Sequence, residues 1–140
     1  MKVAIAAALL VLASSAIAQA ETQTSPSAKG AKVLITEPKD GATVSSPVTV
    51  KFGIEGMEVA PAGTDKPNTG HHHLIIDATL PSPTEAIPAD ANHVHFGKGQ
   101  TEATVELKPG EHTLQLILGD KNHVPHTPPV VSDVVKITVK

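Results

Sequence analysis

The sequence predicts an all-β protein: a small immunoglobulin-like β-sandwich that follows a cleaved signal peptide. Two observations predict this fold class. Beyond the first twenty residues, no segment has a sustained helical period of apolar residues. Six or seven short segments are instead rich in Val, Ile and Leu or alternate apolar with polar residues, and Gly- or Pro-rich turns separate them. The 140 residues have the length of one domain.

The first twenty residues have the pattern of a secretion signal. Lys2 supplies a positive charge, residues 3–13 are apolar, and Ala16 and Ala18 are small residues that fit a cleavage site. The apolar run is too short for a helix that crosses a bilayer of about 30 Å. We therefore expect a periplasmic or secreted protein whose mature form has no membrane span.

Three regions are expected along the chain. Residues 1–20 are the signal peptide, and residues 21–31, rich in Ser, Thr, Ala and Gln, are typical of a flexible tether. Residues 32–140 are expected to form the β-sandwich domain. Its first strand is the apolar segment 33–35, because Pro and Asp-Gly follow it and indicate a tight turn.

The remaining strands are separated by loops rich in Gly and Pro. Residues 48–54 alternate and should turn their even-numbered residues inward, whereas segment 71–78 has the apolar run 74–76 directly after its histidines. A long connection with three prolines leads to a short extended segment, 93–96. Residues 101–107 alternate again. The last two expected strands are 114–118 and 134–139, with a proline-rich loop between them.

Seven of the eight histidines fall in three short clusters. The clusters are His71 to His73, the pair His93 and His95, and the pair His123 and His126. In an immunoglobulin-like strand order, the loop before strand 71–78 and the loop after strand 114–118 lie at the same end of the sandwich. The clusters are therefore expected to converge there, whereas His112 should lie at the opposite end.

This clustering predicts a metal site, because imidazole nitrogen is a ligand for zinc and copper. Side chains alternate along a strand, so His71 and His73 should share one face while His72 takes the other. The candidate ligands are His71, His73, His93, His95, His123 and His126. Copper(II) or zinc is the expected ion, since the soft ligands of copper(I) are nearly absent: the chain has no cysteine, and Met57 is the one methionine after the signal. Nitrogen ligands in general bind copper(II) more tightly than zinc, which favours copper(II).

Several functions remain open at this point. The first is a protein that binds, buffers or delivers metal without turnover, with Asp77 and Asp120 accepting ring N–H groups of the ligands. The second is a module that contacts an envelope protein partner without metal. A small metallo-enzyme with an open coordination position ranks third, because no carboxylate with an obvious general-base role accompanies the histidines. Nucleic-acid binding is excluded by the net charge of −3 and the lack of a basic stretch.

Several motifs carry a resemblance to a known family. They are GHHHLIID at 70–77, HVHFGKGQTE at 93–102, PGEHTLQL at 109–116, GD at 119–120 and HVPH at 123–126. In these motifs the chain resembles the bacterial exported family called domain of unknown function 4399, over about residues 51–140. The resemblance implies a small periplasmic β domain and no established activity. The family pattern also includes Glu111 and His112, beyond the candidate ligands.

Overall fold

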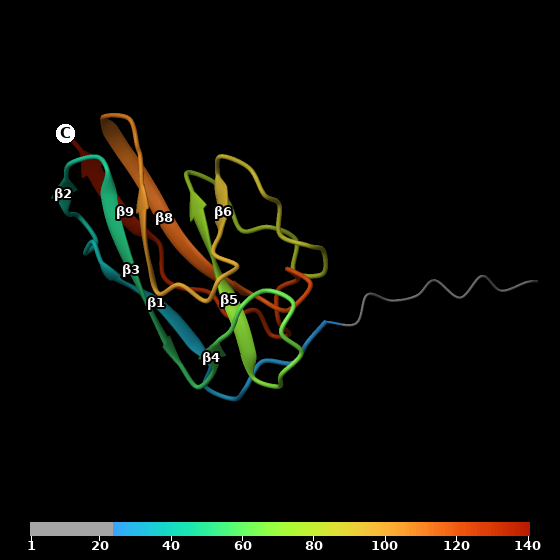
Figure 1. Cartoon of the computed structure of the whole chain (residues 1–140). Helices are drawn as coiled ribbons and strands as arrows, with labels where there is room; N and C mark the ends of the chain where they lie inside the picture. Colours follow the sequence, from blue (N-terminus) through green and yellow to red (C-terminus); the bar gives the residue numbers. More distant parts are fainter. Residues whose placement is uncertain (1–23) are drawn as a thin grey trace, which may run out of the picture.

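The computed structural model describes residues 24–140, which form two β-sheets packed face to face (Figure 1). One sheet has three strands in the order β1-β3-β7, and the other has the order β2-β9-β8-β5-β4, with β6 also paired to β5. The strands are β1 Lys32–Glu37, β2 Thr43–Val44, β3 Val48–Glu55, β4 Glu58–Val59, β5 Thr69–Ile76, β6 His93–His95, β7 Glu102–Val105, β8 Gly110–Gly119 and β9 Val135–Val139. No helix occurs among these residues. The predicted all-β sandwich is confirmed.

The way the strands are divided between the sheets is that of the immunoglobulin-like fold. β3 lies between β1 and β7 and is antiparallel to both. In the second sheet, β8 lies between β5 and β9 and is again antiparallel to both. Grouping the first, second and fourth long strands against the third, fifth and sixth is the arrangement of that fold.

The core lies between the two sheets and is aliphatic, with two phenylalanines. In β3 the predicted alternation is confirmed, since Val48, Val50 and Phe52 are buried while the residues between them are exposed or half-buried. Across the core, β8 contributes three fully buried leucines. The main buried residues are Val33, Ile35, Val48, Val50, Phe52, Leu74, Ile76, Leu114, Leu116, Leu118, Val135, Ile137 and Val139.

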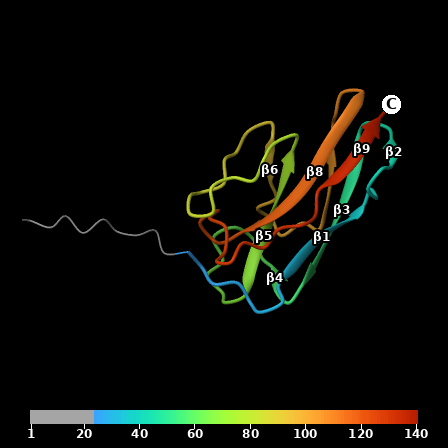
Figure 2. The same ribbon diagram turned by 180° about the vertical axis from the view of Figure 1, so that it is seen from behind.

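β5 departs from alternation, because all eight of its residues are buried. Its inner face packs in the core, and its outer face is covered by the chain connections around β6 and after β8. These connections lie beyond β5, away from β1 and β3, in both views (Figures 1 and 2). A second apolar cluster of Ile75, Ile87 and Ile117 forms under this cover. Polar side chains on the outer face of β5 are therefore enclosed.

Residues 24–31, the described part of the predicted tether 21–31, contact the domain. Pro26 forms a parallel bridge with Thr127. The amide of Thr127 donates to the carbonyl of Ser25 at 2.9 Å, and the Ser25 hydroxyl donates to the Asp120 carboxylate at 2.8 Å. These hydrogen bonds join this segment to the loop that follows β8.

The predicted signal peptide, residues 1–20, lies outside the described residues. β1 begins at Lys32, where the sequence predicts that the domain starts. Within residues 24–140, no helix has the length and the apolar character needed to cross a membrane.

Candidate metal centre

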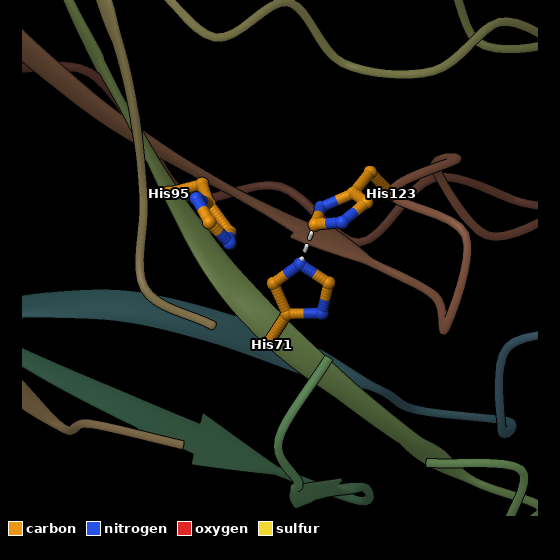
Figure 3. Close-up of side chains that lie close together, drawn as sticks. All are labelled: His71, His95 and His123. Carbon is orange, nitrogen blue, oxygen red and sulfur yellow. Dashed lines mark hydrogen bonds between the residues drawn. The ribbon is translucent and has the colours of Figure 1, made fainter. Parts of the chain in front are cut away.

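Four histidine rings gather on the outer face of the larger sheet. His71 and His73 come from β5, His95 from β6 and His123 from the loop after β8. The centroids of every pair of these rings lie between 4.6 and 5.6 Å apart. Ring nitrogens of His71, His95 and His123 lie within 4.8 Å of one another (Figure 3). We call these four residues the histidine cluster.

Strand register places three of the four rings. Alternation along β5 puts His71 and His73 on the outer face, and antiparallel pairing sets His95 opposite His73. Gly119 lies opposite His71 on β8. A Cβ at Gly119 would lie 2.6 Å from Nε2 of His73, and a Cβ at Gly97 would lie 2.5 Å from Nε2 of His95. The missing side chains of these two glycines therefore provide space for two of the rings.

The fourth ring depends on a tight turn held by Asp120. Its carboxylate accepts hydrogen bonds from the amides of Asn122 at 2.8 Å and Val124 at 3.1 Å. Its carbonyl accepts one from the amide of His123 at 2.9 Å. His123 adopts φ 63°, a left-handed conformation in which histidine is enriched among non-glycine residues. The carbonyl of His123 then accepts from the amide of Ile87 at 2.7 Å, so the long connection before β6 is attached at the same residue.

Three ring nitrogens converge inside the cluster. Nε2 of His71 lies 3.0 Å from Nδ1 of His123 and 2.9 Å from Nε2 of His73. A neutral imidazole directs a lone pair from either nitrogen, because its proton can reside on the other. Ligand nitrogens around a tetrahedral zinc ion, with bonds of about 2.0–2.1 Å, lie about 3.3 Å apart. The separation between the nitrogens of His71 and His123, 3.0 Å, is within a few tenths of an ångström of that value.

Burial favours the uncharged form that a metal requires at three rings of the cluster. Burial, with the neighbouring histidines, lowers the pKa of His73 to about 2. Burial likewise lowers the pKa of His71 to about 4, and it lowers the pKa of His123. The negative charge of Asp120 opposes the last two shifts. His71 and His73 are each 1% exposed, so their rings are enclosed and the uncharged form is favoured at neutral pH.

His93 lies outside the cluster although the sequence predicts it as a ligand. Antiparallel pairing sets it opposite Ile75, two residues and roughly 7 Å further along β5 than His95. Its Nδ1–H donates to the Asp90 carboxylate at 2.7 Å, a hydrogen bond that also lowers the pKa of Asp90. A local contact with the preceding loop therefore determines where this ring lies.

His126, also a predicted ligand, is buried at a separate position near the start of β5. It is 1% exposed, and its Nε2–H donates to the carbonyl of Thr69 at 3.2 Å. Its Nδ1 has no hydrogen-bond partner within residues 24–140. Pro125 forms a bridge with Gly119, so the chain runs past the end of β8 after His123 and carries His126 away from the other rings.

His72 lies on the opposite face of β5, as alternation predicts. Its ring is fully buried in the core, 5.0 Å from the ring of Phe52. Neither of its nitrogens has a partner among the described residues. His72 is therefore a core residue with unsatisfied polar atoms. Its position between two outward-facing neighbours is the one feature of the sequence that indicates this burial.

His112 lies away from the cluster and is hydrogen-bonded to Asp77. The ring donates from Nδ1 to the Asp77 carboxylate at 2.6 Å and from Nε2 to the carbonyl of Lys108 at 2.7 Å. The other Asp77 oxygen accepts from the amide of Thr113 at 2.8 Å. Neither Asp77 nor Asp120 accepts a ring N–H from the cluster, which corrects the role predicted for them. Asp120 instead fixes the turn and accepts from Ser25.

The His112 contacts predict a pH-dependent contribution to stability. Hydrogen bonding to Asp77, and then to the carbonyl of Lys108, raises the pKa of His112. A raised folded-state pKa gives stability that is fully present below about pH 6.5 and is lost as pH rises through the raised value. We expect His112→Leu to lower the melting temperature more at pH 6 than at pH 8.5. Thermal unfolding of both proteins at each pH measures this, and a pH-independent difference would contradict it.

Comparison with known proteins gives a family and one fold neighbour. A family described as "Domain of unknown function (DUF4399)" matches residues 50–140. The chain is also similar to solved fibronectin(III)-like modules of Clostridium thermocellum CbhA, with 18% sequence identity and a TM-score of 0.41. That similarity covers 77% of this chain and 95% of the other. No curated protein matches the chain. The function must therefore be inferred from the chain's own residues.

Proposed function

The chain belongs to the DUF4399 family, and we propose that it is an exported protein that binds a divalent transition metal at the histidine cluster. It would hold or deliver the ion in the periplasm or outside the cell. The observation that carries the proposal is the convergence of ring nitrogens of His71, His95 and His123 within 4.8 Å of one another. The signal-like pattern of the first twenty residues supports export.

His71, His95 and His123 are the proposed ligands. Nε2 of His71 faces both His123 and His73, which makes it the central donor of the set. His95 is exposed and His123 is half-buried, whereas His71 and His73 are enclosed. An ion would thus enter past His95 and His123, and His73 would lie next to it.

The arrangement of the rings favours zinc. The ring centroids of the three proposed ligands lie 4.8, 4.9 and 5.6 Å apart, so the longest separation is about 1.2 times the shortest. Three ligands of a square plane, the geometry that copper(II) prefers, would place one pair about 1.4 times as far apart as the other two pairs. Nearly equal separations are instead those of a tetrahedron, the usual geometry of zinc. Copper(II) binds nitrogen sites more tightly in general, so it is the competing ion to test.

Metal titration of the purified protein tests the proposal. A ligand that binds the folded state alone at 100 times its Kd stabilises that state by about 2.7 kcal/mol. We expect zinc to raise the melting temperature of the wild type by several degrees. His95→Ala should abolish the shift, because it removes an exposed ligand without opening the core.

His93→Ala is the matched control, since it changes a histidine of the same short strand that lies outside the cluster. It should retain the zinc-dependent shift. If neither zinc nor copper(II) stabilises the wild type, or if both variants respond equally, the histidine cluster is not a metal site.

A further inference from the structure

A cavity of about 240 Å³ adjoins the histidine cluster. One wall is formed by three imidazoles and the other by apolar side chains of the connection between β5 and β6. The lining residues are His73, His95, His123, Ala86, Ile87 and Ala89. Pockets for drug-sized ligands measure about 300–1,000 Å³, so this one suits a molecule of a few atoms.

The cavity lies where a bound metal would have a free coordination position. Two of the three proposed ligands, His95 and His123, line it, whereas His71 does not. A metal held by all three would therefore have His71 on one side and the cavity on the other. Three nitrogens leave a tetrahedral ion with one further position. We propose, on the basis of the function proposed above, that this position takes a small monoanion that occupies the cavity.

Charge favours an anion over a neutral ligand. Three neutral imidazoles leave the two positive charges of the metal uncompensated. Asp120, the carboxylate whose charge reaches His71 and His123, offsets one of these two charges and leaves one for a monoanion. The opposite wall of the cavity is apolar, which strengthens the attraction between the metal and an anion. Azide, halides and short carboxylates have the required charge and size.

His73 is placed to hold such an anion. Its hydrogen-bond contact is Nε2 of His71 at 2.9 Å, and its Nδ1 has no partner among the described residues. Coordination by Nε2 of His71 would occupy its lone pair, with the ring proton on Nδ1, so Nε2 could neither donate to His73 nor accept from it. An anion in the cavity, which His73 lines, would supply a new acceptor for its N–H.

Cobalt(II) is a suitable probe, because it takes the same nitrogen ligands and its visible absorption reports coordination. Titration of the cobalt-loaded full-length protein with azide, and separately with acetate, should change the visible spectrum with saturation. Ala86→Leu and Ala89→Leu, which add bulk to the cavity wall, should weaken azide binding at least tenfold while cobalt still binds. Ala91→Leu is the matched control, because Ala91 is exposed on the same connection, as Ala86 and Ala89 are, but does not line the cavity.

The possible results separate the two proposals. A cobalt spectrum that neither anion changes would show that the fourth position is closed, and this would overturn the inference while leaving the metal site intact. Equal azide binding in wild type, Ala86→Leu and Ala89→Leu would overturn the assignment to the cavity. Failure of the protein to bind cobalt, zinc or copper(II) would overturn the metal site and the anion site together.

Discussion

Replacing His72 with leucine is expected to raise the free energy of unfolding of the metal-free protein by about 1–3 kcal/mol at pH 7. The imidazole is fully buried, and neither nitrogen has a hydrogen-bond partner within residues 24–140. Folding therefore removes two polar atoms from water without replacing their hydrogen bonds. Leucine fits the apolar surroundings that Phe52 and Leu118 provide and carries no polar atom. Denaturant unfolding of the two proteins measures the difference.

The same substitution should reduce the loss of stability in acid. Burial lowers the pKa of His72 from 6.5 to about 4, so the unfolded chain binds a proton that the folded chain excludes. A lowered histidine pKa makes stability fall as pH drops from about 6.5 to about 4. A pKa lowered from 6.5 to about 4 corresponds to about 3 kcal/mol. His72→Leu should therefore lose about 3 kcal/mol less than wild type across this interval.

The matched control for this prediction is His93→Leu, which changes a half-buried histidine bonded to an exposed carboxylate. It should not reduce the loss of stability in acid as His72→Leu does, because its ring lies outside the core. If His72→Leu instead destabilises the protein at pH 7, then His72 contributes an interaction beyond packing and the assignment of its nitrogens as unsatisfied is wrong.

The parts of the site that the sequence predicts are those governed by periodicity and topology. Alternation along a strand places His71 and His73 on one face and His72 on the other. The immunoglobulin-like order brings the start of β5 beside the end of β8, as the register of His71 with Gly119 shows. These two rules also place His123 near His71 and leave His112 at a distance.

The parts that the sequence does not predict depend on local contacts and on chain segments that fold back. His93 satisfies the same alternation as His95, but the position of β6 along β5 and the bond to Asp90 place it elsewhere. His126 is carried away by the bridge between Pro125 and Gly119. The connection that covers the outer face of β5 shows no periodic pattern of apolar residues in the sequence, because Ile87 is an isolated large apolar residue in a proline-rich segment.

Two glycines, Gly97 and Gly119, look like ordinary turn or strand positions in the sequence, but each packs closely against a histidine ring. Neither has the left-handed backbone that requires glycine, so each accepts alanine if the space allows. A Cβ at Gly119 would lie 2.6 Å from Nε2 and 2.9 Å from Cδ2 of His73, whose ring is 1% exposed. We expect Gly119→Ala to cost about 1–3 kcal/mol of unfolding free energy, because the enclosed ring cannot move without disturbing its neighbours. Denaturant unfolding of the metal-free protein measures this.

Gly97→Ala should have little effect on stability but should weaken zinc binding. Its Cβ would lie 2.5 Å from Nε2 of His95, but that ring is exposed and can turn toward solvent. The free energy of unfolding should therefore change by less than about 0.5 kcal/mol. A displaced His95 would no longer face His71 and His123, so zinc affinity should fall at least about tenfold, or 1.4 kcal/mol. Zinc titration with a competing chelator measures this change.

The two variants Gly119→Ala and Gly97→Ala separate effects on packing from effects on metal binding within the histidine cluster. A stability loss in Gly119→Ala with little change in Gly97→Ala is expected, because one ring is enclosed by the sheet and its cover while the other borders solvent. Unchanged zinc affinity in Gly97→Ala would mean that the position of His95 does not matter to the ion, and His95 would then have to be removed from the ligand set. Since His95 is the exposed member of that set, its loss would also remove the proposed entry route for the metal.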